Sequence, residues 1–131
     1  MLVKRLVFLS AVMVILPAFA QINFSHSNMT GVHMGHANLT GVHMEYCNLT
    51  GADLNHANLS RAVLSHSNLK DANLRGADLR SADLRTVENL APEMVKAAKH
   101  WNLAYYDESM LKALGLPPDH NARLGTHGLT K

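Results

Sequence analysis

Apolar residues recur at every fifth position over much of this chain. Residues 22–86 divide into thirteen consecutive five-residue units without an insertion. The third residue of every unit is apolar: Phe24, Met29, Met34, Leu39, Met44, Leu49, Leu54, Leu59, Leu64, Leu69, Leu74, Leu79 and Leu84. The first residue of each unit is small in nearly every case, and Ile22 is the one bulky exception. The other three positions are polar, Gly or His, except for Val63.

A period of five matches neither the 3.6-residue period of an α-helix nor the two-residue period of a plain strand. It predicts a chain that turns a corner every five residues. The first and third residues of each unit then point inward, because a spacing of two places them on one face of an extended segment. Cys47 occupies a first position where Ala or Ser usually stands. We therefore predict a buried thiol rather than a reactive one.

The motif Ala-Asn/Asp-Leu, followed by two variable residues, occurs at residues 37–39, 52–54 and 82–84. With thirteen consecutive units of this kind, the chain resembles the pentapeptide repeat family. The resemblance implies an all-β solenoid, a right-handed, four-sided parallel β-helix with four units in each coil. Thirteen units would make slightly more than three coils, stacked at the usual strand spacing of about 4.8 Å.

The second position of the unit is rich in Asn and Asp. Short polar side chains of this kind hydrogen-bond to nearby backbone at turns, and we expect that role rather than ligand binding. The residues concerned are Asn28, Asn38, Asn48, Asn58, Asn68, Asn73, Asp53, Asp78 and Asp83.

The segment that follows the repeats predicts a helical cap over residues 87–118. Pro92 and Glu93 suit the first turn of a helix, and a roughly helical apolar stripe continues through Trp101 and Leu103. Asp107 could cap a second short helix that runs through Ala113. A cap would cover the apolar end and the unpaired edge of a solenoid. Residues 119–131 carry no apolar pattern and are predicted to be a disordered tail.

The first twenty residues are typical of a secretory signal peptide. Lys4 and Arg5 precede an apolar stretch from residue 6 to residue 16, and residues 18–20 form a small-x-small cleavage site. The apolar stretch is shorter than the roughly 20 residues that a membrane span needs, so we expect cleavage after Ala20 and no transmembrane segment afterwards. The protein is therefore predicted to be exported, to a periplasm or out of the cell, with residues 21–86 forming the β-helix.

Charge argues against several classes of function. The chain has 12 Lys and Arg and 10 Asp and Glu, and loss of Lys4 and Arg5 would bring the basic count to 10. This balance argues against nucleic-acid binding, which needs a basic surface. It also separates the chain from the family's quinolone-resistance members, which resemble DNA and protect gyrase; that function is kept as a remote alternative.

No order of nucleophile, base and acid appears, and an enzyme is not expected.

Histidine is the unusual component of the repeats. His26, His36, His56 and His66 share the fifth position with Tyr46, while His33 and His43 share the second. With twenty residues per coil, His36 would stack on His56 and His33 on Asp53. His26, Tyr46 and His66 would form a column on the opposite side, with His43 and Glu45 nearby. Stacked imidazoles with a carboxylate could bind Zn, Cu or Ni, although a repeat can also inherit its His residues without using them.

Two functions of different classes follow from these observations. The first is a non-catalytic exported scaffold that requires no cofactor and binds a protein or an envelope component through flat outer faces. The second is a transition-metal-binding module whose ligands would be His26, His33, His36, His43, Asp53, His56 and His66. No cap comparable to the C-terminal segment precedes Ile22, so that end of the solenoid is expected to be frayed, shielded by a few residues, or paired with another copy in a homodimer.

Overall fold

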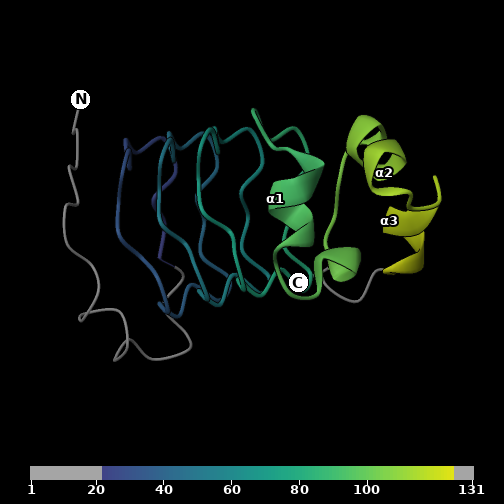
Figure 1. Ribbon diagram of the computed structural model, residues 1–131, viewed down its shortest axis with the longest axis horizontal. Helices are drawn as coiled ribbons and strands as arrows, with labels where there is room; N and C mark the ends of the chain where they lie inside the picture. Colours follow the sequence, from purple (N-terminus) through teal and green to yellow (C-terminus); the bar gives the residue numbers. More distant parts are fainter. Residues whose placement is uncertain (1–21, 126–131) are drawn as a thin grey trace.

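The computed structural model describes residues 22–125, in which the five-residue units wind into stacked coils (Figure 1). Parallel bridges join residues twenty positions apart along the chain. In the first coil, residues 22–41, the bridged positions are Asn23, Asn28, His33 and Asn38. Four bridged positions in twenty residues give each coil four sides. The expected signal peptide, residues 1–20, lies outside the described residues.

Each side of a coil is short. The bridges are isolated rather than joined into longer strands within residues 22–125, because the chain turns again directly after each extended segment. Every fifth-position residue has a positive φ, from His26 at 64° and Gly31 at 65° onward to Thr86 at 59°. A left-handed residue at each corner turns the chain sharply into the next side of the coil. Residues other than glycine adopt this conformation at a cost of about 1–2 kcal/mol, which the surrounding coils must offset.

Backbone hydrogen bonds connect each coil to the next. The Phe24 N–H donates to the carbonyl oxygen of His43 at 2.7 Å, and the His43 N–H donates to the carbonyl oxygen of Ile22 at 3.0 Å. The same two bonds recur on every side of the solenoid, as between Met34 and Asp53. The ladder thus satisfies backbone groups that would otherwise be buried without partners.

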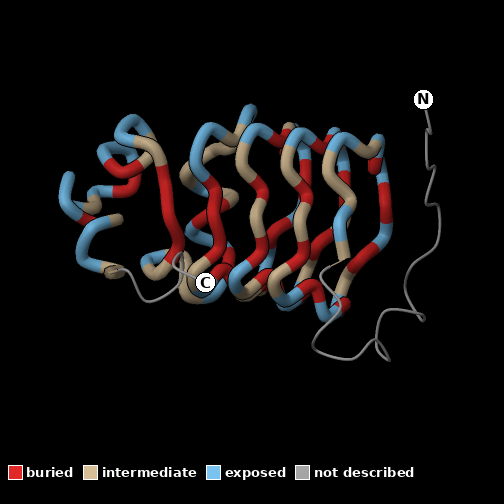
Figure 2. The backbone as a smooth tube through the Cα atoms, turned by 180° about the vertical axis from the view of Figure 1, so that it is seen from behind, coloured by how far each residue is buried: buried red, intermediate tan, exposed pale blue. Residues whose placement is uncertain are grey.

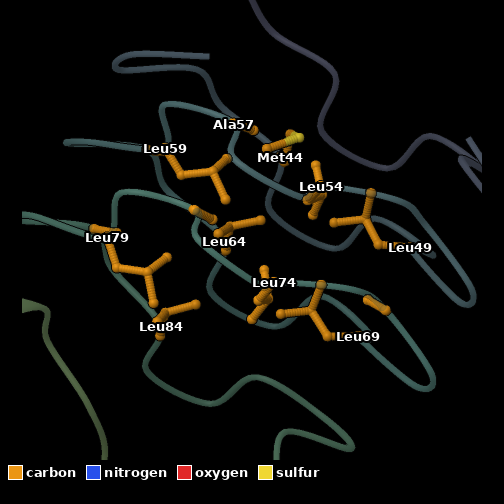
Figure 3. Packing of buried hydrophobic residues seen from close by; sticks show 14 of the residues in the cluster. Met44, Leu49, Leu54, Ala57, Leu59, Leu64, Leu69, Leu74, Leu79 and Leu84 are labelled. Carbon is orange, nitrogen blue, oxygen red and sulfur yellow. The ribbon is translucent and has the colours of Figure 1, made fainter. Parts of the chain in front are cut away.

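The core runs along the axis of the solenoid, as the sequence pattern predicts. Third-position side chains from all four sides converge there, and those twenty residues apart stack, as Leu54 does on Leu74 (Figure 3). Buried and exposed residues alternate along each coil (Figure 2). Cys47 is buried as predicted, and its thiol donates to the carbonyl oxygen of Phe24 at 3.0 Å. Burial raises the pKa of this thiol.

The predicted role of the second-position Asn and Asp residues is confirmed. Each accepts a hydrogen bond from the backbone N–H two residues later, as Asn28 does from Thr30 at 3.2 Å. In four units the hydroxyl at the fourth position also donates to the same oxygen, at 2.6 Å in the pair Thr50 and Asn48. These bonds fix the turn at each corner.

The parallel ladder continues past the last repeat. Glu88 still bridges Asn68 at a separation of twenty residues, and Lys99 and Tyr105 then bridge Asp78 and Asp83. The separations of the last two pairs are 21 and 22 residues. Residues 87–106 therefore add an irregular coil, in which the short helix α1 (Pro92–Lys96) lies against the last repeats (Figure 1).

Two expectations for the C-terminal segment need correction. The apolar stripe predicted a helix reaching Leu103, but α1 ends at Lys96. The chain there returns to the ladder, where the Lys99 N–H donates to the carbonyl oxygen of Ala77 at 2.7 Å. A separate 3₁₀ turn, η2 (Trp101–Leu103), follows. These ladder bonds compete with helix formation, and they join residues about twenty positions apart, so the local sequence pattern does not reveal them.

The helix predicted from Asp107 is present as α2 (Glu108–Leu114). The Asp107 side chain accepts from the Met110 N–H, and Gly115 ends the helix with a φ of 72°. The tail predicted to be disordered instead contains a helix, α3 (His120–Arg123), while residues 126–131 lie outside the described part. His120 and Asn121 hold α3 in place through bonds to residues 104 and 106. Among residues 22–125, no helix is long and apolar enough to cross a membrane.

Candidate functional site

An exposed column of three rings follows one corner of the solenoid. His26, Tyr46 and His66 occupy the same corner in successive coils, and we call them the aromatic ridge. The ring centroids of His26 and Tyr46 are 4.8 Å apart with an interplanar angle of 3°, and those of Tyr46 and His66 are 4.7 Å apart at 4°. Tyr46 remains 54% exposed and is the one exposed large hydrophobic residue within residues 22–125. The stacking predicted from the twenty-residue period is confirmed.

A second stack lies half a coil away. The rings of His36 and His56 have centroids 5.1 Å apart and planes 10° apart, as the sequence predicts. The other face of the His56 ring lies against Gly76, which occupies the same corner of the next coil. The ring of His56 thus lies between the ring of His36 and the backbone of Gly76, while the residue as a whole remains exposed.

A carboxylate lies beside the aromatic ridge. Glu45 accepts a hydrogen bond from the Ser25 hydroxyl at 2.7 Å, and its other oxygen lies 3.0 Å from Nδ1 of His43. Burial by itself raises the pKa of Glu45, but the bonds from Ser25 and His43 outweigh it and hold the pKa below its usual value. Ser25 and His43 both contact Glu45 rather than each other, so this group does not have the geometry of a hydrolase triad.

Asp53 stands on the opposite side of the coil, next to His33 in the ladder. Its Oδ1 atom accepts from Nδ2 of Asn55 at 2.6 Å and from Nδ2 of Asn73 at 3.1 Å. The bond from Asn55 is the main reason that the pKa of Asp53 lies below its usual value. The carboxylate is therefore engaged in holding two coils together, and His33 makes a minor favourable contribution through its charge.

The predicted metal ligands do not form a ready-made site in this conformation. Within residues 22–125, no group of three His, Cys, Asp or Glu side chains is placed to hold a metal ion. An imidazole nitrogen binds a metal through a lone pair that lies in the plane of its ring. The rings of His36 and His56 are stacked with only 10° between their planes, so their lone pairs point side by side rather than toward one ion. Metal binding would require these rings to rotate, and it stays a prediction.

Two other histidines were missed by the sequence analysis. His100 bonds through Nδ1 to Asp78 at 3.0 Å and through Nε2 to the Arg80 guanidinium at 3.1 Å. His120 is buried, and its Nε2 atom lies 3.0 Å from the carbonyl oxygen of Ala104. Both residues lie beyond the regular repeats, where no period indicates which residues meet. His100 connects the C-terminal segment to Asp78 and Arg80 of the repeats, and His120 connects α3 to Ala104 within the C-terminal segment.

The family is decided by the repeated sequence together with the coil that it forms. The family model for pentapeptide repeats matches residues 19–45 and 47–85, with eight copies. This chain belongs to the pentapeptide repeat family. Proteins of this family have a right-handed, four-sided β-helix, and they are in general not enzymes.

Solved structures of pentapeptide repeat proteins resemble this one. A protein from the Arabidopsis thaliana thylakoid lumen is 26% identical with a TM-score of 0.50, and the match covers 52% of this chain and 47% of that one. A protein from Nostoc is 29% identical with a TM-score of 0.38, and the match covers 73% of this chain and 84% of that one. The chain thus spans about half the length of the thylakoid protein.

One further match is to QnrB1, a plasmid-mediated fluoroquinolone resistance protein. It is 19% identical with a TM-score of 0.33, and the match covers 72% of this chain and 43% of QnrB1. No curated protein matches the sequence.

Proposed function

We propose that this pentapeptide repeat protein is a non-catalytic exported scaffold that binds a protein or another envelope component through its outer surface. The observation that carries this proposal is the exposure of Tyr46 in the middle of the aromatic ridge. Tyrosine is enriched at protein interfaces, where a rigid ring supplies contact area at low entropic cost. Stacking on His26 and His66 holds this ring in one orientation before any partner arrives.

The surroundings of the ridge favour a polar, flat contact. Ser25, Glu45 and Ser65 occupy the fourth position beside the ridge and are each half-buried. The hydrogen bond of 2.7 Å between Ser25 and Glu45 already holds these two side chains, so they lose little conformational entropy when a partner covers them. A contact centred on Tyr46 would therefore combine one aromatic anchor with a preorganised polar rim.

The C-terminal segment supports the same proposal in another way. We infer that residues 87–118 act as a helical cap that keeps the solenoid soluble as a single scaffold. Val95 of α1 and Leu111 and Leu114 of α2 are buried in the common core. Without these residues the last coil would expose its apolar end.

The proposal is tested by a photo-crosslinking amino acid placed at the ridge. We would install it at position 46 and, as a matched control, at Arg61, which is also an exposed corner residue with a positive φ. In intact cells we expect a discrete adduct from position 46 and none from position 61. Equal adducts from both positions, or none from either, would contradict a specific contact at the ridge.

Export is tested separately in the same cells. We expect the protein in the envelope or the medium, with an N-terminus at Gln21 by mass spectrometry. A cytosolic protein that retains residues 1–20 would contradict the exported part of the proposal, whatever the crosslinking shows.

A further inference from the structure

The outer edge of the first coil carries backbone N–H and carbonyl groups that form no hydrogen bond within the described chain. In the second coil, the N–H and carbonyl groups of second-position residues bond to the coil before, as His43 does with Ile22 and Phe24. The equivalent residues of the first coil are Asn23, Asn28, His33 and Asn38. Their backbone N–H and carbonyl groups have no partner among residues 22–125. We call these four residues the N-terminal edge.

The other end of the solenoid is different. There the chain's own irregular coil pairs with the last repeats through Glu88, Lys99 and Tyr105. Beyond it, Asn121 bonds to both backbone groups of Tyr106, with Nδ2 donating at 2.6 Å and Oδ1 accepting at 3.2 Å. The protein therefore covers one end with its own residues, and the N-terminal edge remains open within the described chain.

The first coil also lacks the charges that usually protect such an edge. Residues 22–41 contain no Asp, Glu, Lys or Arg, whereas every later coil carries several. Natural proteins place charges, above all Lys, on edge strands to prevent pairing with another chain. Three of the four residues of the N-terminal edge are asparagines, Asn23, Asn28 and Asn38, which carry no charge that would oppose such pairing.

We propose that the N-terminal edge binds the same edge of a second copy of this chain. A second copy has a coil of the same four-sided outline, so all four sides can pair together. A two-fold axis perpendicular to the solenoid would relate the copies and would set the facing segments antiparallel, a favourable pairing pattern. The contact uses the same surface on both copies, so it closes at a dimer. This surface is distinct from the position of Tyr46 in the second coil.

Sedimentation equilibrium of the protein, purified as cells produce it, tests this proposal. The edge variant is Asn28→Lys with Asn38→Lys, and the control is Asn48→Lys with Asn58→Lys. The control residues lie one coil further on the same two sides, are equally exposed, and make the same turn bonds. Both variants therefore lose the same local interactions, and they differ in where the new charges lie.

We expect the native protein and the control variant to dimerise at pH 7.5, and the edge variant to dimerise at least about tenfold more weakly. A native protein that is monomeric over roughly two orders of magnitude in concentration would overturn the proposal. Equal weakening in both variants would overturn it as well, because the charges would then act at another surface.

Discussion

The ring of His56 occupies the space that a side chain at Gly76 would need. A Cβ atom on Gly76 would lie 2.5 Å from both Cε1 and Nδ1 of His56. Gly76 also has a φ of 69°, which glycine adopts without strain. These two residues, twenty positions apart, show how a side chain in one coil constrains the sequence of the next.

Substitution Gly76→Ala should cause two separate effects, a steric clash with the His56 ring and the backbone strain of a positive φ in a residue with a Cβ atom. Gly51 has a φ of 67°, and a Cβ atom added there would meet no atom within 4 Å, so Gly51→Ala introduces the strain without the clash. We expect Gly51→Ala to cost about 1–2 kcal/mol, and Gly76→Ala to cost at least about 1 kcal/mol more. Urea denaturation measures both values.

The double variant His56→Ala with Gly76→Ala supplies the control. Removal of the ring makes room for the new methyl group, so the cost of Gly76→Ala should fall to that of Gly51→Ala. An unchanged cost in the absence of the ring would show that the clash with His56 is not the cause.

Three carboxylates make the solenoid sensitive to acid. The pKa values of Asp53, Asp78 and Glu45 lie below their usual values, chiefly through hydrogen bonds that offset the effect of burial. A carboxylate whose folded-state pKa is depressed stabilises the fold above its unfolded pKa, and this stability is lost as the pH falls through the folded value. We expect the urea concentration at the midpoint of unfolding to decrease when the pH is lowered below about 4, where Asp and Glu of the unfolded chain begin to bind protons.

Asp53→Asn isolates one of these groups. The variant should reduce the fall in the urea midpoint between about pH 5 and about pH 3, because position 53 no longer binds a proton. Asp71→Asn is the control, since Asp71 is exposed and its side chain has no hydrogen bond within residues 22–125. If the two variants show the same pH dependence as each other, the bonds from Asn55 and Asn73 do not stabilise the charged form.

The two hydrogen bonds between Asn121 of α3 and the backbone of Tyr106 predict the effect of a substitution in the C-terminal segment. Asn121→Ala would leave the N–H and carbonyl groups of Tyr106 without their partner. We expect a loss of about 1–3 kcal/mol, the usual cost of unsatisfied buried polar groups. Hydrogen exchange should accelerate in residues 101–115 and stay unchanged in residues 42–61. If residues 101–115 exchange at the same rate in the native protein and in the variant, the Asn121 side chain does not stabilise this segment.

The metal hypothesis is tested by calorimetric titration with Zn, Cu(II) and Ni at pH 7.5. The nearly parallel His36 and His56 rings, and the absence of any group of three candidate ligands within residues 22–125, lead us to expect no micromolar binding in the native protein. The control replaces His36 and His56 by Asn. Micromolar binding that disappears in this control would contradict our expectation, and it would establish the second function predicted from the histidine pattern.

The repeat allowed the sequence to predict which residues meet within the coils. A fixed period converts a separation of twenty residues into a contact, so the stacks at Tyr46 and His56 and the burial of Cys47 could all be predicted. The period also predicted a stacking distance of about 4.8 Å, close to the 4.8, 5.1 and 4.7 Å between ring centroids. It could not give the nearly parallel orientation of the His36 and His56 rings, which keeps their nitrogen lone pairs from converging on one metal ion. It also missed His120 and α3, because contacts beyond residue 86 follow no period and depend on how the irregular coil returns to the ladder.

The register of twenty residues per coil underlies the aromatic ridge and the other contacts between coils. The most direct test is a nuclear Overhauser measurement on the ring protons of Tyr46. Our account predicts contacts from Tyr46 to the rings of both His26 and His66, since these centroids lie 4.8 and 4.7 Å away. Contacts from Tyr46 to neither ring, or to rings at other separations in the sequence, would contradict the coil and the ridge built on it.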